Sequence, residues 1–154
     1  MIMEYDVIII GAGSAGLSAA LACNEKGLKK ILILERESEC GGILQQCIHN
    51  GFGLHEFKEE LTGPEYLTRF VDEVINNKIE FWLESTVIKI NKRKEIFVIN
   101  KKGYIKIYAK AIIIATGCFE RSAGSISLNG TRPSGIITAG AAQKYLNIHG
   151  YLVG

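Results

Sequence analysis

Six residues near the N-terminus, Gly11-Ala12-Gly13-Ser14-Ala15-Gly16, have the types and spacing of a phosphate-binding turn. In such a turn the first glycine allows a sharp bend after a strand, the second lets a pyrophosphate approach the backbone, and the third lets the next helix pack closely. Unpaired N–H groups and the positive dipole end at the start of that helix bind an anion without a basic side chain. The motif predicts binding of a dinucleotide.

One carboxylate adds to this motif. Glu35 ends the next apolar run, at the place where an acidic side chain accepts hydrogen bonds from ribose hydroxyls. A 2′-phosphate would meet like charge there, so the sequence disfavours NADP at this site. The simpler alternative is a glycine-rich turn followed by a surface glutamate, with no nucleotide bound.

The elements that must hold the motif follow from the apolar pattern. Tyr5–Ile10 is a short β-rich run that ends at a glycine, Ser14–Lys26 has helical character, and Ile31–Leu34 is a second apolar run. Continuous apolar runs joined through a helix are typical of parallel strands that are covered on both faces. A β-α-β unit is therefore expected.

The rest of the sequence predicts a second helix and five more strands. After Pro64, which suits a first helical position, apolar residues recur with the period of a helix that packs one face on a sheet. The expected strands are Ile79–Leu83, Thr86–Ile90, Glu95–Asn100, Tyr104–Tyr108 and Ala111–Ala115. The middle three are expected to form an antiparallel meander over about residues 85–109. The predicted fold class is α/β: a Rossmann-like parallel sheet with helices on both faces and an inserted three-stranded antiparallel meander.

Composition argues against several other classes of protein. A content of 47% hydrophobic and 22% charged residues is ordinary for a globular domain and too apolar for a disordered chain. The net charge of +2 gives no sign of a nucleic-acid or acidic-lipid partner, and the lysines of the meander are expected on a solvated face. The uncharged stretch Val7–Cys23 is interrupted by glycines and lacks the flanks of a signal peptide or membrane span. Four cysteines are too few for a disulfide scaffold, so a cytoplasmic protein is expected.

Two further motifs carry a resemblance to a known family. Glu35 is followed after five residues by Gly41-Gly42, and a later apolar run ends in Ala115-Thr116-Gly117. Together with the first motif, these resemble the flavin signatures of FAD-dependent oxidoreductases with two dinucleotide-binding domains, the superfamily that includes the pyridine nucleotide-disulfide oxidoreductases. The stretches Cys40–Gly53 and Gly117–Arg121 are more similar to members without a redox disulfide, which are subunits of bacterial dehydrogenases for glycerol phosphate, opines or sarcosine.

The resemblance implies an FAD site and assigns residues to its parts. The residues implied to bind the pyrophosphate are Gly11, Gly13, Ser14, Ala15 and Gly16. The resemblance further implies that Glu35 binds the ribose and that Arg36 and the backbone of Val87 lie by the adenine. It also implies that Gly42 lies near the phosphates or the ribityl chain and that Thr116 and Gly117 close the site. From the residues alone, the Ala115–Gly117 segment is equally compatible with a strand that runs into a turn.

This sequence lacks the redox cysteines of the disulfide reductases. The corresponding positions are Leu44 and His49, so thiol-disulfide chemistry on that pattern is not expected. Cys47 and His49 could lie near a flavin ring and tune it or handle a proton, or they could be a buried thiol and a loop histidine without a role. The spacing of Cys40, Cys47, His49 and His55 does not match a short zinc loop, and no metal is expected.

The resemblance also implies parts that these residues do not contain. Related proteins continue with a second β-α-β unit for NAD(P)H and a Gly-Asp pair, and neither occurs in residues 1–154. We therefore expect the N-terminal portion of an FAD-binding domain, from an oxidoreductase that uses NAD(P)H, a small-molecule substrate or a partner dehydrogenase subunit. By themselves the 154 residues are expected to be inactive and to self-associate through an exposed apolar flank. Two alternatives stay open: an NAD-binding dehydrogenase module and a noncatalytic nucleotide-binding scaffold.

Overall fold

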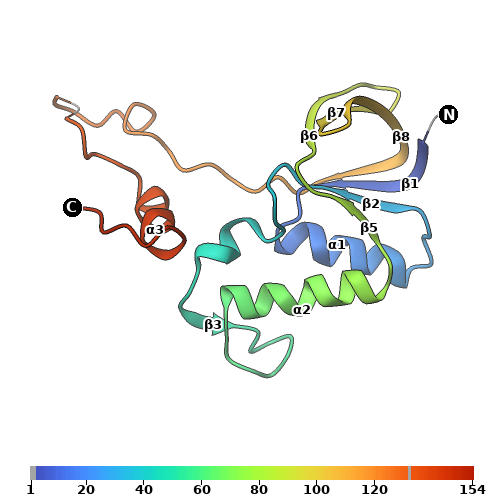
Figure 1. The fold of residues 1–154 in the computed structure, drawn as a ribbon, viewed down its shortest axis with the longest axis horizontal. Helices are drawn as coiled ribbons and strands as arrows, with labels where there is room; N and C mark the ends of the chain where they lie inside the picture. The colour runs from blue at the N-terminus through green and yellow to red at the C-terminus, as the bar shows by residue number, and fades with distance from the viewer. Residues whose placement is uncertain (1–2, 132) are drawn as a thin grey trace.

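The computed structural model describes residues 3–131 and 133–154, which form a curled β-sheet with helices along it (Figure 1). The strands of the main sheet are β1 (Met3–Ile10), β2 (Ile31–Leu34), β5 (Glu80–Trp82), β6 (Thr86–Ile90), β7 (Glu95–Asn100) and β8 (Gly103–Ile114). Their order in space is β5-β2-β1-β8-β7-β6. The other elements are α1 (Ser14–Glu25), the 3-10 turn η1 (Gly42–Gln46), the ribbon of β3 (Asn50–Phe52) and β4 (Leu61–Thr62), α2 (Gly63–Asn76) and α3 (Ala139–Asn147).

The parallel half of the sheet consists of β5, β2, β1 and the end of β8. Val7 of the central strand β1 pairs with Ile31 of β2 on one side and with Ala111 of β8 on the other. Ile8 and Ile9 are both completely buried, because a strand covered on both faces carries apolar side chains at successive positions. The predicted α/β class and β-α-β unit are confirmed, with α1 ending at Glu25 and Lys26 as its C-cap.

The helices α1 and α2 lie along the same face of this sheet (Figure 1). Leu17 of α1 and Val74 of α2 pack in one core cluster with Val7 and Ile33. The capping box of α2 fixes where that helix begins: the Thr62 side chain accepts from the N–H of Glu65, and the Glu65 carboxylate accepts from the N–H of Thr62. The predicted start of α2 around Pro64 is confirmed.

The opposite face is covered in a way that differs from the expectation of helices on both faces. The meander of β6, β7 and the first half of β8 curls over it (Figure 1). Ile96 and Val98 of β7 and Ile107 of β8 pack there against Ile8 and Leu32. The apolar side of the meander fills the space that a helix would fill in that layer.

A single strand of 12 residues, β8, replaces the two strands predicted at Tyr104–Tyr108 and Ala111–Ala115. Its first half pairs antiparallel with β7 and its second half pairs parallel with β1. Between the halves, Ala109 is completely buried and the Lys110 ammonium group lies 2.7 Å from the Asp6 carboxylate of β1. The strand passes from one partner to the next by bending, so no turn separates the halves.

Residues 115–131 and 133–154 extend away from the sheet and include α3, a helix that we did not predict from the sequence (Figure 1). Its N-terminus is capped by Thr138, which accepts from the N–H of Ala141, and by Glu120, which accepts from the N–H of Gly140 at 2.7 Å. Hydrogen bonds from Thr138 and Gly140 lower the pKa of Glu120. Of the helices in the two described ranges, none has the length and apolarity needed to cross a membrane.

Candidate functional site

The glycine-rich turn follows β1 and is held tightly by the strands on either side. The N–H of Gly11 donates to Leu34 at the end of β2, and the N–H of Ala115 donates to Ile10. A Cβ on Gly11 would overlap the carbonyl group of Ala115, and its φ of +105° is one that side chains disfavour. A Cβ on Gly16 would overlap the carbonyl oxygen of Gly11. The protein's own packing therefore requires glycine at both positions.

Gly13 is different, because a Cβ there would meet no protein atom within 4 Å. Its backbone is extended, with φ −76° and ψ −176°, a conformation that any residue can adopt. Gly13 is the N-cap of α1, and Ser14 and Ala15 in the first turn are exposed. Space for an external group therefore exists over Gly13, where the sequence motif predicts a pyrophosphate.

The start of α1 lacks the caps found on the other two α-helices. Within the described ranges, no side chain caps it and its first turn contains no acidic residue. The first N–H groups of a helix have no partner inside the helix, and the helix dipole makes that end positive. The starts of α2 and α3 are satisfied by the chain's own oxygen atoms, whereas the start of α1 presents its N–H groups beside the open space at Gly13.

Glu35 lies at the end of β2 and is buried, with 8% of its surface exposed. One carboxylate oxygen accepts from the N–H of Ala12 at 2.8 Å, and the other accepts from the N–H of Glu37 at 3.0 Å. The predicted ribose acid therefore directly contacts the glycine turn. The alternative of a surface glutamate does not describe this residue.

The loop after β2 returns to the turn through two consecutive glycines. The N–H of Gly41 donates to the carbonyl oxygen of Ala12 at 2.7 Å. Gly42, with φ +52°, follows and is so placed that a Cβ on it would lie 3.9 Å from the Cα of Gly13. The structure thus brings Gly42 to the edge of the open space at Gly13.

The segment between β5 and β6 runs alongside the residues that follow Glu35. The N–H of Ser85 donates to the carbonyl oxygen of Glu35, and the N–H of Glu84 donates to that of Glu37. Val87 comes two residues later in β6 and is half-buried. Arg36 is exposed and forms an ion pair with Glu37 at 3.1 Å. Residues assigned to the adenine by resemblance therefore belong to two segments that lie side by side.

Thr116 and Gly117 continue from β8 past Ala115, the residue that contacts Gly11, and both are exposed. Gly117 has φ +71°, a conformation that favours glycine, as a strand end that runs into a turn requires. Because β1 and β8 are parallel, their carboxyl ends meet at one edge of the sheet. Ligands of open α/β sheets bind outside this edge.

The cysteine and histidine residues do not form a reactive cluster in the structure. All four cysteines are free, and the described residues contain no group of three His, Cys, Asp or Glu side chains arranged to hold a metal ion. Cys40 packs against the helix-side core; burial, and then the charge of Glu35, raise the pKa of its thiol to about 11. The imidazole of His49 is exposed and packs on Phe52, with ring centres 5.4 Å apart.

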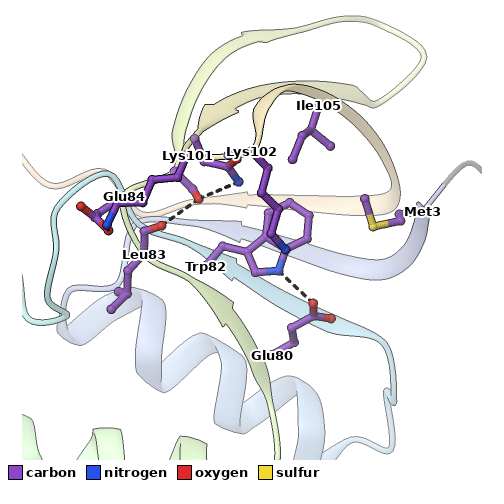
Figure 2. Close-up of a pocket in the computed structure, with 10 residues that line it drawn as sticks. Met3, Glu80, Trp82, Leu83, Glu84, Lys101, Lys102 and Ile105 are labelled. Atoms are coloured by element: carbon purple, nitrogen blue, oxygen red, sulfur yellow. Dashed lines mark hydrogen bonds and ion pairs between the residues drawn. The ribbon is translucent and has the colours of Figure 1, made fainter.

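A pocket of about 380 Å³ opens on the other side of the Glu84–Ser85 segment (Figure 2). It lies between β5 and the end of the β7–β8 hairpin, and Lys101 of the hairpin forms an ion pair with Glu84 at 2.6 Å. The indole N–H of Trp82 donates to Glu80, whose other carboxylate oxygen accepts from the hydroxyl group of Tyr5. None of the residues assigned to the pyrophosphate or ribose lines this pocket.

Sequence reasoning missed three contacts that shape the site. The hydrogen bonds of Ala12 to Glu35 and Gly41 were not anticipated, because an alanine between two glycines gives no polar signal. Gln46 in η1 was also missed: its buried side chain donates to Gln143 at 2.9 Å and so ties the loop carrying Gly42 to α3. The alanine-rich stretch after Thr138 was the signal for that helix.

Comparison with known proteins finds similarity to several oxidoreductases. The chain is 31% identical to the thioredoxin reductase of Buchnera aphidicola subsp. Schizaphis graminum over 90% of its own length and 42% of that protein. It is 26% identical to sarcosine oxidase subunit alpha of Corynebacterium sp. strain U-96 over 99% of its length and 16% of that protein. Its fold matches the crystal structure of L-proline dehydrogenase from P. horikoshii with a TM-score of 0.73 and 22% identity, over 96% of this chain and 29% of that one.

The chain thus spans less than half the length of these relatives. Residues 5–150, which include the glycine turn, Glu35, Gly41-Gly42 and Ala115-Thr116-Gly117, match the family described as pyridine nucleotide-disulphide oxidoreductase. On the sequence match and on the geometry of the turn, the chain belongs to the pyridine nucleotide-disulphide oxidoreductase family.

Proposed function

We propose that this chain binds the ADP half of FAD at the carboxyl edge of its parallel strands. The observation that carries the proposal is the start of α1, where uncapped N–H groups face open space over Gly13. A helix start of this kind is an anion site in many nucleotide-binding proteins. The pyrophosphate of the cofactor would lie there.

The residues around the turn fit the remaining parts of an ADP group. Ser14 and Ala15 would donate backbone N–H groups, and Gly13 and Gly42 would keep side chains out of the pyrophosphate position. Each carboxylate oxygen of Glu35 accepts one backbone N–H, which leaves each oxygen a second acceptor position for a ribose hydroxyl. Arg36 and the backbone of Val87 would border the adenine.

FAD is favoured over NAD by the strand end at Thr116 and Gly117, which would close the site next to Gly11. When bound, the flavin would supply hydride and single-electron transfer. The residues named here bind and orient the cofactor, and no catalytic acid or base is assigned to this chain. Cys47 and His49 stay candidates for positions near the flavin ring.

For the whole protein we propose a flavin-dependent oxidoreductase located in the cytoplasm, to which residues 1–154 contribute the N-terminal portion of the FAD-binding domain. NAD(P)H would bind outside these residues. The substrate would be a small molecule such as glycerol phosphate, an opine or sarcosine. The similarity to a sarcosine oxidase subunit supports assembly with a partner dehydrogenase subunit.

Calorimetric titration of the 154-residue chain with ADP, FAD and NAD tests the cofactor assignment. We expect binding of ADP and FAD and loss of both in Gly13→Val, because the branched side chain would fill the open space over the turn. Ser18→Val, at an exposed position one turn further along α1, is the control and should bind as the wild type does.

Each alternative has its own outcome in this titration. Binding of NAD in preference to FAD would favour an NAD-binding dehydrogenase module. A folded wild-type chain that binds none of the three would favour the noncatalytic scaffold. Unchanged ADP affinity in a folded Gly13→Val variant would move the pyrophosphate away from α1.

A further inference from the structure

Three segments of the site meet at Glu35. Its carboxylate joins the glycine turn through Ala12 and the following loop through Glu37. Its backbone joins the β5–β6 segment, donating to Trp82 at 2.9 Å and accepting from Ser85 at 2.8 Å. A residue that only presented a carboxylate to a ribose would need none of the contacts to the turn.

The contact to Ala12 matters because of where Ala12 lies. The pairing of β1 with its neighbours ends at Ile10, and the intrahelical hydrogen bonds of α1 begin at Leu17. Ala12 is completely buried, so its N–H is shielded from water and needs an acceptor inside the protein. Glu35 supplies that acceptor at 2.8 Å.

Ala12 in turn holds the other side of the open space. Its carbonyl oxygen accepts from Gly41, the residue before Gly42, and Gly13 follows it directly. A change in the orientation of the Ala12 peptide would therefore shift both Gly13 and the Gly41-Gly42 pair. The chain of contacts runs from Glu35 through Ala12 to both walls of the pyrophosphate position.

We propose that Glu35 is a positioning residue for the phosphate-binding turn, in addition to its assigned contact with the ribose. This inference rests on the proposed function. In this role Glu35 contributes to the affinity for the pyrophosphate, although the Glu35 carboxylate does not touch that group. Removing the carboxylate should therefore weaken binding of a ligand that has no ribose at all.

The sign of the effect separates positioning from simple electrostatics. Replacing a carboxylate near an anion site by a neutral group removes like charge and so favours anion binding. Positioning predicts the opposite, since Glu35→Gln exchanges one acceptor oxygen for an NH₂ group that would face the N–H of Ala12 or Glu37. Glu37→Gln is the matched control, because it removes one neighbouring charge while the exposed Glu37 side chain pairs only with Arg36 among the described residues.

The test is a titration of wild type, Glu35→Gln and Glu37→Gln with inorganic pyrophosphate and with ADP, followed by ¹⁵N NMR on the full 154-residue chain. We expect Glu35→Gln to lose roughly fivefold or more in affinity for pyrophosphate. We expect Glu37→Gln to bind pyrophosphate as the wild type does or slightly more tightly. Exchange of the Ala12 amide hydrogen should be slow in the wild type and faster in Glu35→Gln.

Three results would overturn the inference. Glu35→Gln with weakened ADP binding and unchanged or tighter pyrophosphate binding would leave Glu35 with a ribose contact alone. Rapid exchange of the Ala12 amide in the wild type would show that the hydrogen bond is not formed, and this measurement needs no variant to fold. A wild-type chain that binds neither ligand would contradict the proposed function, and the inference that rests on it would then fail as well.

Discussion

The carbonyl oxygen of Gly11 occupies the space that a side chain at Gly16 would need. The close approach of these two residues sets the distance between α1 and the strand end. We predict that Gly16→Ala lowers the free energy of unfolding by about 1–3 kcal/mol, the usual cost of overpacking. Urea denaturation measures it, and Ser18→Ala on the exposed face of α1 should change stability by less than about 0.5 kcal/mol. Equal stability of both variants would contradict the close packing.

The capping box of α2 predicts a dependence of stability on pH. Thr62→Ala should destabilise the protein by about 0.5–2 kcal/mol at neutral pH. Hydrogen bonds from the backbone and then the side chain of Thr62 lower the pKa of Glu65 below its ordinary 4.5. A lowered pKa stabilises the folded state above the unfolded-state value, and this part is lost as the pH falls through the folded-state value.

The difference between wild type and Thr62→Ala should therefore shrink as the pH falls from the ordinary value of 4.5 through the lower folded-state pKa, where Glu65 becomes protonated in the folded protein. Thermal unfolding between pH 7 and pH 3 measures this. Thr68→Ala, at an exposed position inside α2, is the control and should lose no stability at either pH. A difference that stays constant over this range would mean that the hydrogen bond between the Thr62 hydroxyl group and the Glu65 carboxylate does not contribute to stability.

Cysteine reactivity should follow the environment of each thiol. Because burial raises the pKa of Cys40 from 9.0 to about 11, its thiolate is roughly 100-fold less abundant near neutral pH, and alkylation slows with it. We expect iodoacetamide to modify the exposed Cys118 first and Cys40 only slowly, as measured by mass spectrometry of peptides. In concentrated urea all four cysteines should react. A native Cys40 that reacts as fast as Cys118, or a disulfide between Cys40 and Cys47, would contradict this assignment.

Attachment of α3 depends on Gln46 more than on apolar packing, since α3 has no buried residue. The side chain of Gln46 donates to Gln143, and its backbone oxygen accepts from the Asn147 side chain at 2.7 Å. We predict that Gln46→Ala speeds amide hydrogen exchange throughout α3, with a loss of about 1 kcal/mol in its local stability. Lys144→Ala, an exposed position on the same helix, should leave exchange nearly unchanged. Equal exchange in both variants would indicate another attachment.

The sequence predicted the parts of the site whose signals are local. Gly11 and Gly13 lie between β1 and α1, Gly16 lies in the first turn of α1, and the positions of all three follow from spacing alone. Glu35 was predicted as a carboxylate directed at a ligand, and its burial and contact with Ala12 were not foreseen, because they depend on how β2 lies beside the turn. The roles of these residues toward FAD stay predictions.

The sequence could not show which layer covers which face. Two strands were predicted at Tyr104–Tyr108 and Ala111–Ala115, yet the ammonium group of Lys110 between them reaches Asp6 and the strand continues. The cover of the second face by the meander depends on the curl of the whole sheet, which no single segment encodes. α3 was not predicted, although Thr138 and the alanine-rich stretch that follows it are signals for the start of a helix.

The contact between Gly11 and Ala115 joins two segments that are made far apart in time, since Gly11 follows β1 and Ala115 follows β8. A ribosome makes the glycine turn before the strand end that packs against it. That strand end follows β8, more than a hundred residues later, as the separation of Asp6 and Lys110 illustrates. At about 5–20 residues per second this interval lasts roughly 5 to 20 seconds. During this interval β1 cannot pair with β8, because β8 has not yet been made. The dinucleotide site therefore forms only after β8 has been made, although its glycine motif is synthesised about a hundred residues earlier.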